Sequence, residues 1–499
     1  MIARFLILGA FLGVSLSLLV APSTTEALGS HVLLPGTRFE TPVWVVDGAS
    51  SGPTVLITGG VHGNEIAGAL AAMEMSSWPI RRGRLVIVPR ANVPALDAGT
   101  RATPFEPEDL ADLNRNFPRQ EGDDPRGALA GALWKLVLEV EPDWILDLHE
   151  GYGFARTNDD TVGSSIIADP RPEVVDVARR LVATVNAEIE EASQRFVLKR
   201  NPVLGSLARA AIDRLQMRAM ILETTTKERL SVRVRQHRVL VRSFLMELGM
   251  LDPESATPRF VREEAGRTRV ALLDDDGADA DELEDIARRL EHDHAFALRR
   301  VSRRDVRDGG LDGFDAIVVA GGRASVMGRA IGISGREAIE RFVRGGGAFV
   351  GIGAGAYLAT REYDWSLALV DANVESRSHW RRGVGEVAVS LTPRGAELFE
   401  DVFDPDVEWR YENGPILSPA GDPDIPDYVA CVLYSEEIAE DDAPRGIMIE
   451  SPALIVAELA KGRIAIFGAL PPEPSRRAPE KAEAGAAADG PAARVQRAP

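Results

Sequence analysis

Two histidines and a glutamate have the side-chain types and the spacing of a metal site. The segment GGVHGNE places His62 and Glu65 three residues apart, directly after the apolar run TVLIT. Side chains three apart on a helix lie on the same side, so an imidazole and a carboxylate would converge there. His149 stands in DLHEG, again at the end of an apolar run. Two imidazoles and one carboxylate leave a fourth position of zinc open for water, the arrangement of a catalytic zinc site.

The alternative to a metal site is an ordinary structural role for these residues. A histidine after a strand is most often an ordinary loop residue, and an H-x-x-E spacing alone carries little information. Three coincidences favour the metal site: glycines flank the first pair, a second histidine stands at a strand end, and an arginine-rich segment lies between them.

The segment between the candidate ligands has residues that suit recognition of a carboxylate. It reads DLNRNFP and contains Asn114 and Arg115, with Arg101 a short distance before it. An arginine offers a bidentate fork to a carboxylate, and an asparagine adds a directed donor. The alternative is a surface loop in which these side chains are simply solvated.

One further carboxylate stands where a buried strand is expected to end. Glu223 closes the apolar run AMILE, and a carboxylate there is costly unless it has a partner or a task. Acting as general base on metal-bound water would be such a task. Asp147 either orients an imidazole or is an ordinary strand residue, and Tyr152 and Arg156 are candidates for contact with a substrate side chain.

The elements that must position these residues form an α/β pattern. Three runs of nearly continuous apolar character, residues 54–58, 84–89 and 144–148, alternate with helical segments at 65–76 and 127–139. Such a pattern predicts a largely buried, mostly parallel sheet covered by helices. A fourth strand at 219–223 and an amphipathic helix at about 227–248 complete this block.

A second α/β block follows a linker. Residues 251–267 are rich in proline and charge, which predicts a linker between two domains. Beyond it the pattern of apolar runs and helices resumes up to about residue 472. The expected elements of this block are strands at 270–273 and 315–319 and helices at 281–291 and 335–344.

Composition excludes several classes of function. The chain has 499 residues, enough for two or three domains, and its formal net charge of −19 argues against nucleic-acid binding. A single cysteine, Cys431, excludes an intramolecular disulfide framework and a thiolate-rich zinc site. Any metal must therefore be held by histidines and carboxylates.

Both ends of the chain differ from the rest. Residues 5–21 are uncharged and apolar after a basic start, and small residues follow, so residues 1–27 are interpreted as a signal peptide that exports the chain to a periplasm or beyond. An uncleaved membrane anchor is the alternative, because 17 residues is the short end of spanning length. Residues 473–499 are rich in Ala, Pro and charge, which predicts a disordered tail.

As an ordered set, the motifs HGNE, TR, DLNRNFP, DLHEG and LET resemble the zinc carboxypeptidase superfamily, most closely its succinylglutamate desuccinylase/aspartoacylase branch. The resemblance covers about residues 40–250 and implies a three-layer α/β/α domain over residues 35–250. It also implies one zinc ion as cofactor and hydrolysis of an amide bond next to a free carboxylate. The residues that match carry these implied roles: His62, Glu65 and His149 bind zinc, Asn114 and Arg115 grip the substrate carboxylate, Arg101 stabilises the oxyanion, and Glu223 is the general base.

The block at 268–472 resembles class I glutamine-amidotransferase-like domains, of the kind placed before biotin protein ligase modules. The motifs are DAIVVAGG, GGGAFVGIGAGAY, YENGP and GRIAIFGALP. The resemblance implies a flavodoxin-like α/β domain whose cysteine nucleophile would stand at Gly353, so thiol catalysis is absent. Two roles remain open for this domain. Its glycine-rich turn could bind an anion, or the domain could be a degenerate scaffold that packs against the hydrolase or a partner. The scaffold is the favoured alternative.

The sequence leaves three functions open. The first is a zinc-dependent deacylase of N-acyl amino acids, which follows from the closest motifs. The second is an exported zinc carboxypeptidase acting on peptides such as peptidoglycan stem peptides, which follows from the leader. The third is a non-catalytic ligand-binding protein. The expected partner is a small amide or peptide substrate with a carboxylate, and nothing in the sequence indicates an oligomeric state.

Overall fold

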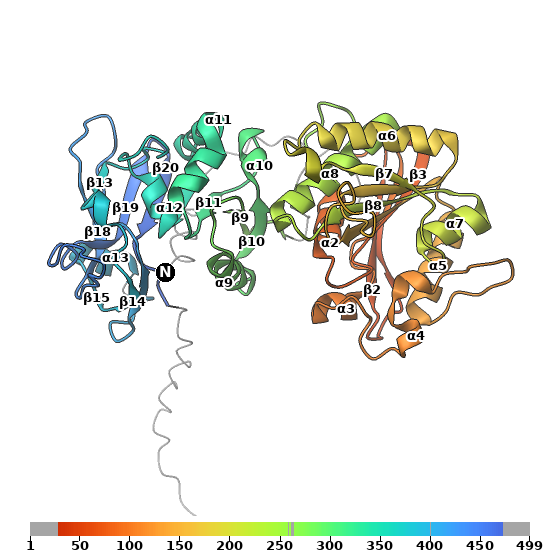
Figure 1. Ribbon diagram of the computed structural model, residues 1–499, viewed down its shortest axis with the longest axis horizontal. Coiled ribbons are helices and arrows are strands. Elements are labelled where there is room, and N and C mark those ends of the chain that lie inside the picture. Colours follow the sequence, from red (N-terminus) through yellow and green to blue (C-terminus); the bar gives the residue numbers. More distant parts are fainter. Residues whose placement is uncertain (1–27, 258, 261–263, 400, 473–499) are drawn as a thin grey trace, which may run out of the picture.

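The computed structural model describes residues 28–257, 259–260, 264–399 and 401–472, which form two α/β domains (Figure 1). The interpreted leader at 1–27 and the tail at 473–499 lie outside the described residues. None of the helices in the described part of the chain combines the length and the apolar character needed to cross a membrane.

The first domain is built on an eight-stranded sheet with the strand order β1-β2-β4-β3-β5-β8-β6-β7. The four central strands, β4, β3, β5 and β8, are parallel, so their carboxyl ends share one edge of the sheet. The strands are β1 (Leu28–Leu33), β2 (Thr41–Asp47), β3 (Ser50–Gly59), β4 (Arg82–Val88), β5 (Trp144–Gly151), β6 (Ser165–Ala168), β7 (Val197–Arg200) and β8 (Arg218–Thr225).

Helices cover both faces of this sheet. One hydrophobic core lies between the sheet and α2, α6 and α8, and a second lies between the other face and α5 and α7. The three-layer α/β/α arrangement predicted from the sequence is therefore confirmed. The helices are α2 (Ile66–Met75), α3 (Val93–Ala98), α4 (Glu108–Ala111), η1 (Leu113–Arg115), α5 (Ala128–Val140), α6 (Pro172–Asn186), η2 (Ala192–Gln194), α7 (Leu207–Leu215) and α8 (Leu230–Glu247).

The second domain has a sheet with the order β10-β9-β11-β12-β20-β19-β18-β15, in which the first five strands are parallel. Numbered along the chain, those five strands follow the order 2-1-3-4-5 of flavodoxin-like domains, which confirms that prediction. The strands of this sheet are β9 (Thr268–Leu273), β10 (Phe296–Val301), β11 (Ala316–Val319), β12 (Ala348–Ile352), β15 (Val389–Leu391), β18 (Val429–Tyr434), β19 (Pro452–Leu459) and β20 (Gly462–Phe467).

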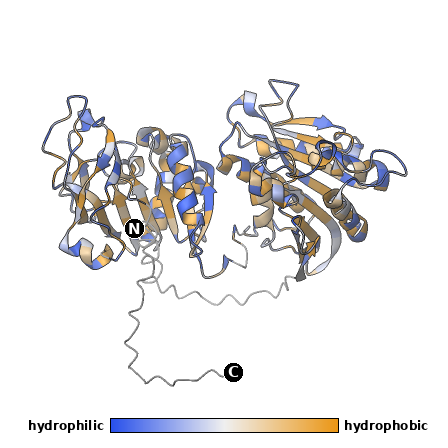
Figure 2. Cartoon of the chain, turned by 90° about the horizontal axis from the view of Figure 1, so that it is seen from below, coloured by the Kyte–Doolittle hydropathy of each residue, from blue (hydrophilic) through white to orange (hydrophobic). Residues whose placement is uncertain are grey.

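The remaining elements of this domain are helices and two small sheets, in which β13 pairs with β17 and β14 with β16. Figure 2 shows the strands of both domains in the colours of apolar residues, as expected for buried sheets. The elements are α9 (Ala280–Glu291), α10 (Arg303–Arg307), α11 (Ala324–Arg344), α12 (Ala354–Ala359), β13 (Ala372–Val374), η4 (Arg377–His379), β14 (Val384–Val387), α13 (Pro393–Phe399), β16 (Trp409–Glu412) and β17 (Leu417–Pro419).

Three boundaries differ from the sequence-based expectations. Strand β1 joins the first sheet although it precedes residue 35, where the domain was expected to begin. The helix expected at 335–344 begins at Ala324, because the chain continues through a kink at Gly332, which has a φ of 69°. Strand β5 runs on to Gly151, so His149 lies inside a buried strand rather than just after one.

Candidate metal centre

The turn that follows β3 brings the first two candidate ligands to the carboxyl edge of the sheet. The chain leaves β3 at Gly59, passes His62, and enters α2 at Glu65, which is the residue that precedes the first helical turn. The turn passes so close to helix α3 that a Cβ on Gly63 would lie 1.7 Å from the Ala95 carbonyl oxygen. Only glycine fits there, which explains one of the glycines that flank the histidine.

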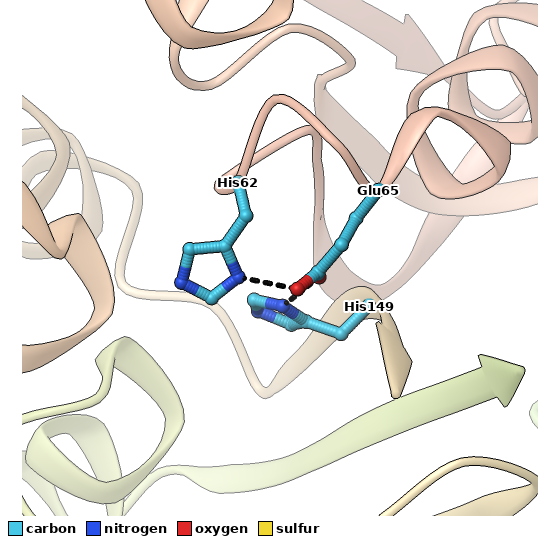
Figure 3. Close-up of side chains that lie close together, drawn as sticks. All are labelled: His62, Glu65 and His149. Atoms are coloured by element: carbon cyan, nitrogen blue, oxygen red, sulfur yellow. Dashed lines mark hydrogen bonds and ion pairs between the residues drawn. The ribbon is translucent and has the colours of Figure 1, made fainter. Parts of the chain in front are cut away.

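The three candidate ligands converge on one another (Figure 3). His62 Nδ1 lies 2.7 Å from one carboxylate oxygen of Glu65, and His149 Nδ1 lies 2.7 Å from the other. One donor atom from each of these residues lies within 4.8 Å of the other two. All three side chains are buried.

Two aspartates lie behind the imidazole rings. His62 Nε2 is 3.0 Å from Asp112 Oδ1, and His149 Nε2 is 3.0 Å from Asp147 Oδ2. The other oxygen of Asp147 accepts a hydrogen bond from Thr58 Oγ1 at 2.5 Å. The Asp112 carboxylate favours a proton on His62 Nε2, which leaves the His62 Nδ1 lone pair directed at Glu65.

This arrangement requires positive charge between the imidazoles and the carboxylate. Burial lowers the pKa of His149, but Asp147 and Glu65 outweigh it and raise that pKa well above its usual value. Burial raises the pKa of Glu65, but His149 and His62 outweigh it and hold that pKa below its usual range. Two imidazoles and a carboxylate are donors that zinc prefers. The residues present therefore fit a zinc ion, whose charge would replace the protons.

Glu223 lies on the strand next to His149. Strands β5 and β8 are parallel neighbours in which His149 and Glu223 are paired in register. Burial raises the pKa of Glu223 to about 8; Glu65 adds to this rise, and His149 opposes it. A cation bound at His149 would favour the ionised form of this carboxyl group. The sequence had placed Glu223 at the last position of a strand, whereas β8 continues to Thr225.

Arg101 and Asn114 also reach the ligands. The Arg101 guanidinium, which is 48% exposed, donates to Glu65 Oε1 at 3.1 Å and to Asp112 Oδ2 at 3.1 Å. Asn114 is buried, with Nδ2 3.2 Å from His149 Nε2 and Oδ1 accepting from the Leu207 amide. The structure thus places Arg101 and Asn114 beside the candidate metal ligands. Oxyanion stabilisation by Arg101 and binding of a substrate carboxylate by Asn114 stay predictions.

Arg115 lies beside this group rather than in it. Its Nη1 donates to the carbonyl oxygen of Asn114 at 2.7 Å rather than to one of the three candidate ligands. Tyr152 and Arg156 follow β5 and were considered for substrate contact. Tyr152 is 72% exposed, with Lys227 Nζ 4.0 Å from its ring centroid, whereas Arg156 donates to two backbone carbonyls.

The sequence-based reasoning missed three charged residues of the centre. Asp112, which holds His62, is the first residue of the DLNRNFP segment, and the motif itself was the only signal for it. Glu150 follows His149 directly; its amide donates to Glu65 Oε2 at 3.1 Å and its carboxylate pairs with Arg233. Nothing in the sequence links Glu150 to Arg233, because 83 residues separate them.

The second domain has a strand-to-helix turn at Gly353, between β12 and α12. Gly353 has φ 51° and ψ −104°, and a Cβ there would meet only Gly321 Cα, at 3.6 Å. The turn has the geometry of a nucleophile elbow but no side chain to attack with. Burial raises the pKa of the Cys431 thiol to about 11, so that sulfur is a poor nucleophile.

Two family models match the chain, one in each domain. Residues 51–155 match the succinylglutamate desuccinylase/aspartoacylase catalytic domain, and residues 276–379 match the N-terminal region of biotin-protein ligase. Both resemblances are confirmed. The desuccinylase/aspartoacylase match contains His62, Glu65 and His149, whereas Glu223 lies beyond it.

Three known proteins are similar to parts of the chain. An N-α-acetyl-L-2,4-diaminobutyric acid deacetylase of Halomonas elongata is 41% identical over 117 residues, which are 22% of this chain and 32% of that protein. The cell shape determinant protein Csd4 of Helicobacter pylori is 18% identical, with a TM-score of 0.37 over 46% of this chain and 63% of that one.

A succinylglutamate desuccinylase/aspartoacylase structure from Rhodobacter sphaeroides is 23% identical, with a TM-score of 0.33 over 44% of this chain and 62% of that one. The chain therefore spans about a third of the length of its curated relative and less than two thirds of these two solved chains.

Proposed function

We propose that the chain is a zinc-dependent hydrolase that cleaves an amide bond adjacent to a free carboxylate. The observation that carries the proposal is the buried His62–Glu65–His149 group, with Glu223 paired in register beside His149. Burying a carboxylate beside a metal site is costly unless it has a task, which favours an enzyme over a non-catalytic binding protein.

Each residue of the centre has a chemical task in this proposal. His62, Glu65 and His149 hold the zinc ion, which when bound supplies Lewis acidity to a carbonyl and lowers the pKa of water. Glu223 accepts the proton of the attacking water and delivers it to the leaving amine. Arg101 is the cation that stabilises the developing oxyanion. The remaining two residues, Asn114 and Arg115, orient the substrate carboxylate.

For the substrate, we propose an N-acyl amino acid. The relative from Halomonas elongata, by its name, removes an acetyl group from the α-nitrogen of 2,4-diaminobutyric acid. Its identity with this chain supports a deacylase, and the family model of residues 51–155 supports the same class. The acyl group and the amino acid are to be found by screening.

A second candidate is an exported zinc carboxypeptidase, which the interpreted leader at residues 1–27 favours. Deacylases of amino-acid catabolism act inside the cell, whereas an exported hydrolase of this kind would meet peptides, such as the stem peptides of peptidoglycan. The two candidates share the metal centre and differ only in the group on the acyl side of the scissile bond.

Metal analysis and a substrate panel test the proposal together. We expect purified wild-type protein to bind about one zinc ion per chain, and we expect His149→Ala to lose it. Zinc-loaded protein is then offered N-acetyl and N-succinyl amino acids and peptidoglycan stem peptides. Release of an amino acid from an acyl compound supports the deacylase, and release from a stem peptide supports the carboxypeptidase. Zinc-free protein, with no change in metal content on His149→Ala, would overturn both.

A further inference from the structure

The second domain caps a helix of the first. Helix α8 begins after Arg229, whose side chain makes no capping hydrogen bond to the helix. Asp274, just past β9 in the second domain, accepts the Ser231 amide N–H at 3.1 Å and the Arg229 guanidinium at 3.0 Å. Ser231 Oγ also donates to the Asp274 carbonyl oxygen. A carboxylate at the start of a helix satisfies an orphan amide and complements the helix dipole.

A second contact holds the same helix further along. Asp305 lies in the first turn of α10 in the second domain and is buried. Its Oδ1 accepts hydrogen bonds from Arg235 at 3.2 Å and from Arg238 at 2.5 Å, both on α8. The helix is thus tied to the second domain at its first turn and again near its middle. Figure 1 shows α8 and α2 on the side of the first domain that faces β10 and α10.

The same helix reaches the metal centre from its other side. Arg233 donates to one carboxylate oxygen of Glu150, and the other oxygen accepts the Ala67 amide N–H at 2.7 Å. Ala67 lies in the first turn of α2, so Glu150 caps the helix that Glu65 precedes. The Glu150 amide then donates to Glu65 Oε2. Two helix caps are therefore connected through the Arg233–Glu150 ion pair.

The ion pair between Arg233 and Glu150 links α8 to the metal centre strongly because both charges are shielded from water. The Glu150 side chain has no exposure and the Arg233 side chain is 14% exposed. A buried carboxylate that loses its cation is costly and shifts its position or its protonation. Movement of the Glu150 carboxylate would release the Ala67 amide in the first turn of α2, the helix that Glu65 precedes.

We propose that the second domain is a positioning module for the metal centre. It sets α8 through Asp274, and α8 sets Glu150 and hence Glu65 and His149 through Arg233. Asp274 and Arg233 are positioning residues in this scheme. The inference rests on the proposed zinc hydrolase, and it gives the domain with no nucleophile a task that needs no chemistry of its own.

Zinc affinity of the full-length protein tests the inference. Removing a group that supports a metal ligand typically weakens metal binding about 10–100-fold, and we expect about tenfold for Arg233→Met. For Asp274→Ala, one step further away, we expect roughly three- to tenfold. The Co²⁺-substituted protein should show a changed visible absorption spectrum in both variants, because that spectrum reports ligand geometry.

Conservative variants and a matched control separate positioning from loss of stability. Asp274→Asn keeps an acceptor for the Ser231 amide and should bind zinc as wild type does. Arg233→Met combined with Glu150→Gln removes both charges and should restore zinc affinity to within about threefold of wild type. Asp279→Ala removes a cap of equal kind inside the second domain, where Asp279 accepts the amides of Asp281 and Glu282, and should leave zinc affinity unchanged.

The outcomes distinguish the inference from the function on which it rests. Wild-type protein that binds no zinc overturns the proposed function. Wild-type protein that binds zinc and hydrolyses, with less than a twofold change in zinc affinity for Asp274→Ala, overturns the positioning role alone. Should Asp274→Ala not fold, Arg233→Met tests the inference by itself, because it breaks the link between α8 and Glu150. An unchanged Co²⁺ spectrum together with unchanged zinc affinity in Arg233→Met overturns the inference.

Discussion

The turns after β3 and after β12 share a strand-to-helix backbone arrangement but carry different side chains. Each leaves the carboxyl end of a central parallel strand and leads into a helix. The first carries His62 and Glu65, which face His149. The second has Gly353 at the position of a nucleophile, with room for a side chain and none present. The same strand-to-helix geometry therefore provides a place for chemistry, and only the side chains decide whether chemistry occurs.

Carboxylates near the two turns show the same contrast. Glu65 lies between two imidazoles, an arrangement that calls for a cation. Glu282 lies beside the second turn and accepts the Gly321 amide N–H at 2.9 Å. Burial raises the pKa of Glu282 to about 7, so near neutral pH this carboxyl group is partly protonated. Within the described residues, the first turn alone belongs to a group of side chains able to hold a metal.

The largest expected effect belongs to Glu223, the proposed general base on β8 beside the metal centre. Glu223→Gln keeps the shape of the side chain but cannot accept a proton, so we expect kcat to fall by roughly 10²–10⁴-fold. Zinc content should stay at the wild-type level, because Glu223 is not one of the ligands. Steady-state kinetics and metal analysis check this, with Glu139→Gln, an exposed change on α5, as the control. Turnover of the glutamine variant at the wild-type rate would remove Glu223 from the mechanism.

The contact between the domains should give the next largest effect, on stability. Asp305 is buried among Arg235, Arg238 and Arg259, and its carboxylate is the charge that compensates them. Asp305→Asn should therefore cost about 3–5 kcal/mol, measured as a shift in the denaturation midpoint. Glu340→Gln, which breaks an exposed pair with Arg344, should cost roughly 0.5 kcal/mol or less. Equal losses in the two variants would mean that the buried cluster is no stronger than a surface pair.

The same aspartate predicts a dependence of stability on pH. Burial raises the pKa of Asp305, but Arg238, Arg259 and Arg235 outweigh it and hold that pKa far below its usual range. A group with a depressed folded-state pKa stabilises the fold above its unfolded pKa, about 3.9, and that contribution is lost as the pH falls toward the folded value. Wild-type protein should thus lose more stability between about pH 5 and pH 2 than Asp305→Asn does.

The smallest effect is expected at the second turn. Gly353 has a φ of 51°, and an Ala side chain would meet only ordinary contacts there, so Gly353→Ala costs backbone strain of about 1–2 kcal/mol. Hydrolysis by the proposed zinc centre should be unchanged within about twofold, because the turn lies in the second domain and the three candidate ligands lie in the first. A large loss of activity in a folded Gly353→Ala protein would show that the second turn takes part in the reaction.

The features that could be predicted from the sequence are those that depend on local residue patterns and on the order of motifs. Apolar runs and helix periods predicted both α/β domains, because buried parallel strands leave a strong signal. The spacing of His62 and Glu65 and the order of the motifs predicted three side chains that the structure brings together in an arrangement able to hold a metal. The Asp274 cap and the Arg233–Glu150 pair could not be predicted, because they depend on how α8 packs between two domains. The boundary of β5 was wrong because His149 and Glu150 are polar, and polarity resembles a strand end.

The cap that Asp274 provides has a consequence for how the two domains could be separated. A helix that borrows its cap from another domain loses it when that domain is removed, so a severed first domain would begin α8 with an unsatisfied amide. Arg229→Ser would give α8 a cap of its own, since serine is among the preferred residues at that position. We expect that single change to make the first domain less dependent on its neighbour. Comparing the zinc affinity of Arg229→Ser and wild type in the Asp274→Ala background measures that dependence, and no gain there would show that the cap is not what α8 borrows.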